Sequence, residues 1–248
     1  MLIHGSSVTG VMMHPLAEAL QRAGATVYTL DLRGHGASGK KGDIAYVGQL
    51  DDDVADFLAG PCAPPSGARR VMIGFSSGGG FALRFAGGPY GDRFDGYILL
   101  APFLGPNAPT LRPDAGWVSL AIPRLIALSL LDGLHVGRFG GLPVVGFALP
   151  PELAGDPGFT PAYSFRLQAN FGPHMNWQAD LRGIRKPACI LIGSDDEIFF
   201  ADRMAPAIEA VRADIPVEIV PGATHARLVL LPAALRATVA AFGKLTAG

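Results

Sequence analysis

Residues 74–78, with the sequence GFSSG, constrain the fold of this chain more than any other stretch. They follow RVMI at 70–73, a short β-branched run typical of a buried strand, and precede an apolar segment that ends at two glycines, typical of a helix. Glycines on both sides of Ser76 let the backbone turn sharply without a Cβ clash. The stretch predicts a strand, a tight turn that presents the Ser76 hydroxyl, and a helix. Taken alone, it also fits a glycine-rich turn with a capping serine.

The rest of the chain predicts an α/β domain. A length of 248 residues fits one such domain with an insertion. Strands alternate with helices, which indicates a mostly parallel sheet of about six strands with helices on both faces. We expect strands at 1–3, 25–30, 71–75, 97–100, 189–192 and 217–220, and helices at 15–23, 51–58, 79–86, 201–213 and 232–245.

Composition excludes several classes of protein. Hydrophobic residues make up 49% of the chain and charged residues 17%, which excludes general disorder and favours an apolar surface or a large apolar pocket. A net charge of -1 gives no electrostatic footprint for nucleic acid. Cys62 and Cys189 form neither a disulfide framework nor a metal-binding spacing. We therefore expect no nucleic-acid partner, no metal and no cofactor.

Reactive side chains follow the predicted strands, where the chemistry of parallel sheets collects. Ser6 comes just after the first strand, Ser76 after the third, the acidic run 195–197 after the fifth, and His225 after the sixth. A serine hydroxyl needs an adjacent base to become a nucleophile, and histidine can take and return a proton near neutral pH. A carboxylate can orient that histidine. The strand ends therefore predict a nucleophile, an acid and a base in the order Ser, Asp, His.

Five motifs together resemble the α/β-hydrolase serine hydrolases, closest to the monoglyceride lipase, lysophospholipase and serine aminopeptidase-like group. They are LIHG at 2–5, DLRGHGAS at 31–38, GFSSG at 74–78, GSDDEI at 193–198 and GATH at 222–225. The resemblance implies a core domain at 1–103 and 186–248, with a cap, or lid, inserted at 104–185. Two strands that the family usually carries before the LIHG strand are absent here. We therefore expect the strand at 25–30 to be an exposed sheet edge.

The resemblance also assigns roles. Ser76 would be the nucleophile, and His225 the general base and then the acid for the leaving group. The family spacing from Gly193 selects Asp196 as the triad acid, with Asp195 as the alternative. Backbone N–H groups of Ser6 and Ser77 would form the oxyanion hole.

Other motifs have competing interpretations. GHGASG at 34–39 matches the G-x-G-x-x-G dinucleotide pattern, but a turn-like KKGD follows it in place of an apolar helix. We expect His4 and His35 to be structural hydrogen-bonding groups in glycine-rich turns. The acidic run 51–53 fits a helix N-terminus better than a metal cluster.

In this fold the cap would determine which substrate fits. Apolar residues between Trp117 and Leu131 surround a predicted helix on all sides, which fits an acyl-binding lid, a contact with a lipid or membrane surface, or plain cap core. We expect a carboxylic-ester hydrolase, esterase- or lipase-like, that acts on small-molecule esters with apolar acyl groups through an acyl-serine. An acyltransferase or a peptidase on the same triad, or a non-catalytic binding protein of this fold, are the alternatives.

Two further expectations concern the environment of the chain. It starts directly on a strand with no signal peptide, so we expect a cytoplasmic protein unless a preceding segment carried a signal or an anchor. The exposed sheet edge offers one route to a homodimer.

Overall fold

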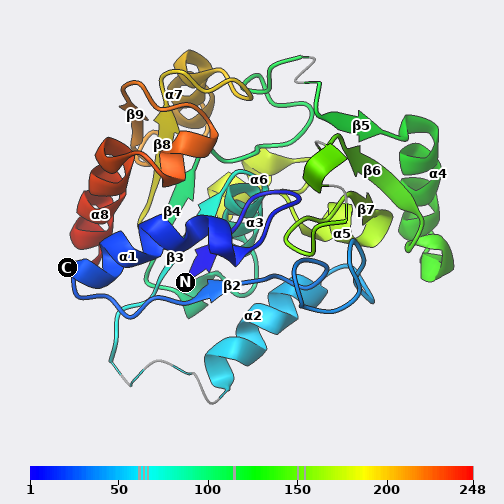
Figure 1. Ribbon diagram of the computed structural model, residues 1–248, viewed down its shortest axis with the longest axis horizontal. Helices are drawn as coiled ribbons and strands as arrows, with labels where there is room; N and C mark the ends of the chain where they lie inside the picture. The colour runs from blue at the N-terminus through cyan, green and yellow to red at the C-terminus, as the bar shows by residue number, and fades with distance from the viewer. Residues whose placement is uncertain are drawn as a thin grey trace.

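The central sheet of the computed structural model contains six strands in the order β2-β1-β3-β4-β8-β9 (Figure 1). The structure describes residues 1–60, 63, 65, 67–113, 116–149, 151–153 and 155–247, so Cys62 lies outside it. Every neighbouring pair of these strands is parallel. The predicted mostly parallel α/β sheet is therefore confirmed. The strands are β1 (Leu2–Ile3), β2 (Thr29–Leu30), β3 (Val71–Phe75), β4 (Gly96–Leu100), β8 (Ala188–Gly193) and β9 (Val217–Val220).

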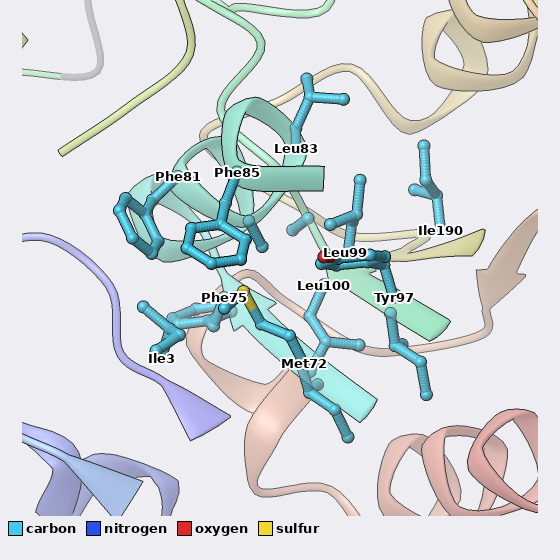
Figure 2. Packing of buried hydrophobic residues seen from close by; sticks show 14 of the residues in the cluster. Ile3, Met72, Phe75, Phe81, Leu83, Phe85, Tyr97, Leu99, Leu100 and Ile190 are labelled. Carbon is cyan, nitrogen blue, oxygen red and sulfur yellow. The ribbon is translucent and has the colours of Figure 1, made fainter. Parts of the chain in front are cut away.

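Helices cover both faces of this sheet. α3 packs against β1, β3 and β4, while α8 packs against β4, β8 and β9 and also contacts α1. Figure 2 shows Phe81 and Phe85 of α3 on one side of β3 and β4, with other helices beyond the opposite side. The core helices are α1 (His14–Arg22), α2 (Gln49–Ala59), α3 (Ser77–Gly87), α6 (Trp177–Gly183), α7 (Ala201–Glu209) and α8 (Pro232–Thr246).

Apolar burial on both faces explains why the central strands form. Leu99 and Leu100 of β4 and Ile190 of β8 have no exposed surface, and β3 is buried throughout. A parallel strand covered by helices on both faces needs a nearly continuous apolar sequence, and these strands have one. Short 3₁₀ helices complete the described chain at Gly10–Met13, Gly91–Arg93, Gly137–Phe139, Pro151–Leu153 and Ala226–Val229.

β2 lies at the edge of the sheet, as predicted, but it is shorter than predicted. The expected strand at 25–30 is reduced to Thr29–Leu30. Among the described residues it pairs only with β1, which itself has two residues, Leu2 and Ile3. A parallel ladder cannot extend beyond its shorter partner, so residues 25–28 fall outside the strand, although the Tyr28 carbonyl still accepts the Leu2 N–H at 2.8 Å.

The segment between β4 and β8 carries a second sheet of three antiparallel strands in the order β5-β6-β7. Figure 1 places it beside the central sheet together with α4. The expected apolar helix from 117 is wrong in its first part, because 118–120 pair with β6 as a strand and Pro123 lies in the first turn of α4. The last part of the segment, α6, packs on α3 of the core. Its other elements are β5 (Val118–Leu120), α4 (Ile122–Gly133), β6 (Pro143–Phe147), β7 (Ala162–Ser164) and α5 (Phe165–Asn170).

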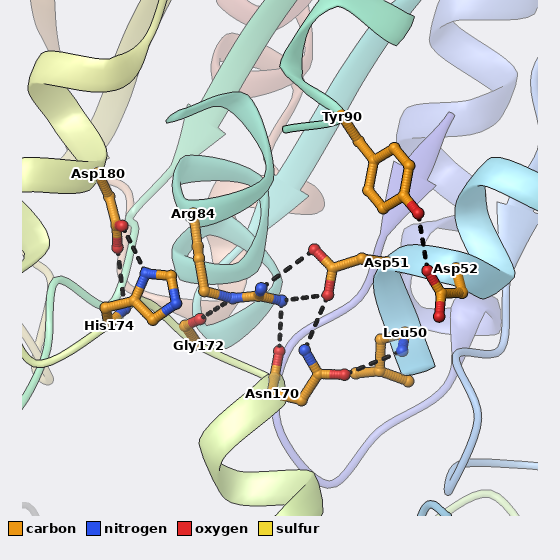
Figure 3. A network of polar contacts seen from close by, with 9 residues as sticks. All are labelled: Leu50, Asp51, Asp52, Arg84, Tyr90, Asn170, Gly172, His174 and Asp180. Atoms are coloured by element: carbon orange, nitrogen blue, oxygen red, sulfur yellow. Dashed lines mark hydrogen bonds and ion pairs between the residues drawn. The ribbon is translucent and has the colours of Figure 1, made fainter. Parts of the chain in front are cut away.

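A buried polar network ties α2, α3 and the end of α5 together (Figure 3). Asp51, in the first turn of α2, accepts hydrogen bonds from Arg84 of α3 at 3.0 and 2.9 Å. Arg84 also donates to the carbonyls of Asn170 and Gly172, and the Asn170 amide donates to Asp51. Because each charged group has its partners, the burial of this ion pair leaves no unpaired charge. The predicted helix N-terminal position of the acidic run is confirmed.

Candidate active site

Ser76 lies at the turn between β3 and α3. Its φ of +55° and ψ of -119° fall in a region that residues with a side chain rarely adopt. The flanking glycines make the turn possible, because a Cβ on Gly74 would lie 2.2 Å from the Gly78 carbonyl oxygen, and one on Gly78 would lie 2.2 Å from that of His4. Tight packing from several sides thus holds Ser76 in a strained conformation, which is common at functional sites.

A continuous chain of hydrogen bonds joins Ser76, His225 and Asp196. The Ser76 hydroxyl lies 2.9 Å from His225 Nε2, and His225 Nδ1 lies 2.8 Å from an Asp196 oxygen. The carboxylate fixes the tautomer, so Nδ1–H donates to Asp196 and Nε2 is left to accept from the serine. All three residues are at most 6% exposed.

The loop after β8 distinguishes the two candidate carboxylates. The second Asp196 oxygen accepts the backbone N–H groups of Ile198 and Phe199 at 2.9 and 2.7 Å. Asp195 is exposed and accepts only from the Ser194 hydroxyl in the described structure. Glu197 accepts the backbone N–H of His225 at 2.8 Å, which fixes the start of the histidine segment. The structure therefore brings Asp196, and not Asp195, against the imidazole.

Ser6 and Ser77 lie beside Ser76 on the same cavity. Their hydroxyls hydrogen-bond to each other. Within the described residues, neither the Ser6 N–H nor the Ser77 N–H has an acceptor. The Ser77 N–H is one of the free donors at the start of α3, where the helix dipole also favours negative charge. The two N–H groups can thus receive an anionic oxygen next to Ser76.

The cavity in front of Ser76 has a volume of about 390 Å³ and mostly apolar walls. Core residues such as Phe103 and Phe199 form one side of it. The segment between β4 and β8, the predicted cap, contributes residues from β5 and β6, and Gln168 from α5. Sequence reasoning missed the β6 contribution, although the two adjacent valines at 144 and 145 favour a strand. The wall residues from the range 104–185 are Pro106, Leu111, Arg112, Gly116, Trp117, Val118, Leu120, Val145, Phe147 and Gln168.

His4 and His35 are both buried behind the site and hydrogen-bonded, as predicted. His4 Nε2 accepts the Leu32 N–H at 3.2 Å, and its Nδ1 lies 2.8 Å from the Gly5 carbonyl. Burial lowers the pKa of both imidazoles, that of His35 well below its ordinary value. Both histidines are therefore neutral groups of the scaffold.

The other groups that the sequence suggested for chemistry or binding form no second site in the described residues. Among the described residues, no three His, Cys, Asp or Glu side chains converge to hold a metal ion. Cys189 is half-buried in β8, and burial raises the pKa of its thiol to about 11, so it is a poor nucleophile. The GHGASG loop at 34–39 leads into further turns before α2 begins at Gln49, so it lacks the helix that a dinucleotide site needs. No helix in the described part of the chain is both long and apolar enough to cross a bilayer.

The fold and the strand-end arrangement define the class of protein, an α/β-hydrolase. Residues 1–229 match the family described as serine aminopeptidase, S33, and the chain belongs to this family.

Individual relatives agree with this assignment. A monoacylglycerol lipase of Mycolicibacterium smegmatis is 27% identical over 231 residues, which cover 90% of this chain and 79% of that protein. The crystal structure of Paleococcus ferrophilus monoacylglycerol lipase superposes with a TM-score of 0.71 at 21% identity, covering 98% of this chain and 93% of that one. An esterase from Thermogutta terrifontis gives 0.64 at 20% identity, covering 99% and 89%. The predicted class, an esterase- and lipase-like α/β-hydrolase, is confirmed.

Proposed function

We propose that this protein hydrolyses carboxylic esters through an acyl-serine intermediate on Ser76, with His225 as base and Asp196 as the acid that orients it. One observation carries the proposal: the hydrogen-bond chain from Asp196 through His225 to Ser76 ends at the wall of an apolar cavity. A hydroxyl activated by a base, beside two free N–H donors, is the arrangement that acyl transfer requires.

The geometry gives each group a step. His225 Nε2 takes the Ser76 proton as the serine oxygen attacks the ester carbonyl, and the resulting oxyanion accepts from the Ser6 and Ser77 N–H groups. The imidazolium then gives its proton to the departing alkoxide, which leaves an acyl-serine. Water, deprotonated by His225, cleaves that acyl group and restores Ser76. Asp196 stabilises the imidazolium in both halves of the cycle.

The cavity walls favour an apolar acyl group. Each methylene of the acyl chain that leaves water for the cavity adds roughly 0.8 kcal/mol to the binding free energy, whatever the direction of its contacts. The aromatic and aliphatic side chains of the cap and the core supply such an environment. One relative is a monoacylglycerol lipase, and an apolar cavity suits such an ester, so we propose lipid-like esters with medium or longer acyl chains as substrates.

The described part of the cavity wall favours an ester over a peptide with a free N-terminus. A free α-ammonium group of a peptide substrate needs a carboxylate partner near the nucleophile. Arg112 is the only charged residue among the described residues that line the cavity, and it carries the wrong sign. An ester without a positive charge therefore fits this site better than the N-terminus of a peptide.

A panel of p-nitrophenyl esters from acetyl to dodecanoyl tests the proposal. The protein should hydrolyse them with a preference for longer chains, and a fluorophosphonate probe should label Ser76. Ser76→Ala should abolish both activity and labelling. Ser129→Ala removes an exposed cap serine outside the cavity and should leave both unchanged. Labelling or turnover that persists in Ser76→Ala would contradict the assignment of the nucleophile.

We also propose that the cap contacts a lipid surface. Its outer side exposes a group of large apolar side chains around α4, with Ile126 at 56% and Leu130 at 66% exposed. Such a group beside the cavity would let a lipid-like ester pass from a membrane without full contact with water. The group comprises Ile122, Ile126, Leu130, Leu134, Val136, Phe139 and Leu142, and the partly exposed wall residues Val118 and Leu120 connect it to the cavity.

Co-sedimentation with phosphatidylcholine vesicles tests this contact. Ile126→Asp combined with Leu130→Asp should reduce the bound fraction, with no change in turnover of a soluble butyryl ester. Val11→Asp alters an apolar side chain that is 79% exposed and outside the cap, and it should bind like the unmodified protein. A soluble dimer that the two cap substitutions dissociate would show that a second copy, and not lipid, covers this surface.

A further inference from the structure

The loop that carries the Ser6 N–H contains a second strained residue. Ser7 has a φ of +66°, and it is one of four non-glycine residues with a positive φ in the described parts of the chain. A serine in this conformation costs free energy, so surrounding contacts must hold it. We call residues 4–7 the oxyanion loop.

Two residues of the cap segment hold Ser7 by all of its polar groups. The Ser7 N–H donates to the Tyr163 hydroxyl at 2.6 Å. The Ser7 hydroxyl donates to the Thr160 carbonyl at 2.9 Å, and the Thr160 N–H donates back to the Ser7 carbonyl at 2.7 Å. The strained conformation is therefore fixed from the cap and not by the core strand that precedes it.

Tyr163 is itself fixed on its far side. It lies on β7, is 1% exposed, and its hydroxyl lies 2.6 Å from His35 Nε2. Burial keeps His35 neutral by lowering its pKa. Its Nδ1 lies 3.3 Å from the Leu32 carbonyl and can donate to it, so Nε2 can accept a hydrogen bond from the Tyr163 hydroxyl. That leaves a lone pair of the Tyr163 oxygen for the Ser7 N–H. The tyrosine ring packs edge-on against Phe147, a wall residue of the cavity.

We infer that Tyr163 is a positioning residue for the oxyanion hole. Its hydroxyl holds the Ser7 peptide, and the neighbouring Ser6 N–H is thereby kept aimed at the oxygen that becomes negative in the transition state. The inference rests on the proposed function, because it concerns the efficiency of the same reaction. Loss of a whole oxyanion donor typically costs a factor of about 10² to 10³ in kcat, so loosening one donor should cost about tenfold.

The substitution Tyr163→Phe tests this role, with Tyr97→Phe as the matched control. Both changes remove a buried hydroxyl and keep the ring, but Tyr97 donates only to the Gly91 carbonyl, remote from the cavity. Tyr163→Phe should lower kcat for p-nitrophenyl butyrate about tenfold and leave KM within about twofold. Tyr97→Phe should leave both constants unchanged.

The affinity for a trifluoromethyl ketone inhibitor is a second measurement, and it would not change if Tyr163 had only a structural role. Ser76 adds to its carbonyl carbon, the serine proton passes to His225, and the new oxyanion occupies the oxyanion hole. Tyr163→Phe should weaken this inhibitor by about the factor lost in kcat, while Tyr97→Phe should bind it normally. If Tyr163→Phe does not fold, Ser7→Ala, which keeps the strained φ and loses the hydroxyl bond to the Thr160 carbonyl, should lower kcat and inhibitor affinity together.

The outcomes separate this inference from the proposed function. Equal kcat values and inhibitor affinities in the Tyr163 and Tyr97 variants would overturn it, and so would a raised KM with an unchanged kcat. If the unmodified protein shows no turnover that depends on Ser76, the proposed function fails instead, before Tyr163 is tested.

Discussion

The core and the cap both line the cavity, but they contribute different kinds of interaction. The core side carries Ser76, Asp196 and His225, all buried and joined by directional hydrogen bonds at strand ends. On the cap side lie apolar side chains such as Val118 and Leu120, which remain 39% and 45% exposed. Groups that transfer protons must be held within fractions of an ångström, whereas apolar burial has no direction. We therefore expect core substitutions to change the rate for every ester and cap substitutions to change which ester is preferred.

Asp196→Asn should give the largest effect and test the core side. The asparagine amide can donate to His225 Nδ1, which would leave the imidazole in the wrong tautomer, so kcat should fall by a factor on the order of 10⁴. The loss should be the same for acetyl and octanoyl esters. Asp195→Asn changes the exposed neighbour and should keep normal activity. A loss that depends on acyl length would contradict the expectation that the core sets the rate for every ester. A loss caused by Asp195→Asn would contradict the assignment of Asp196.

Leu120→Asp tests the cap side. Longer acyl chains should gain up to about fourfold in kcat/KM per added carbon while the cavity has room, and a carboxylate on the wall should remove most of that gain. Hydrolysis of the acetyl ester should stay nearly unchanged. Ile122→Asp is the matched control, since Ile122 is 47% exposed but lies outside the cavity wall. If kcat/KM varied with acyl length in the same way in both variants, the cavity wall would not select the acyl chain.

The smallest effect concerns the polar contact between core and cap at His35. Burial lowers the pKa of His35, so the unfolded chain takes up its proton first as the pH falls below about 6.5. The free energy of unfolding should therefore decrease below that pH, by up to about 1.4 kcal/mol per pH unit for each such histidine. Urea unfolding between pH 7 and 5 measures the slope. His35→Gln should make this slope shallower, and a slope equal to that of the unmodified protein would contradict the prediction.

Much of the core side could be predicted because its residues follow a topological rule. Parallel strands bring their carboxyl ends to one edge, so Ser76, Asp196 and His225 are grouped once the strands are identified. The spacing after Gly193 singled out Asp196, and the structure places that residue against His225. Their catalytic roles stay predictions that the variants above address.

The cap side was harder to predict because its elements depend on partners far away in the sequence. β5 has only three residues and depends on its pairing with β6. Without knowledge of that partner, its apolar residues cannot be distinguished from the first turn of the helix that follows. Tyr163 lies in a Pro-rich segment without periodicity, and its contact with Ser7 spans 156 residues. No local pattern marks such a contact. The division into a core and a cap at 104–185 also stays a prediction, and α6 shows that part of this segment lies on the core.

The short edge strand β2 has a consequence for how the protein behaves at high concentration. Thr29 and Leu30 are the only residues of β2 in the ladder with β1. A strand of another molecule could therefore pair with only two residues at this edge, which is too few to replace the hydrogen bonds that both strands make with water. We expect colloidal stability to be limited by the apolar outer side of the cap and not by this edge. Charged substitutions made to raise solubility therefore belong around α4.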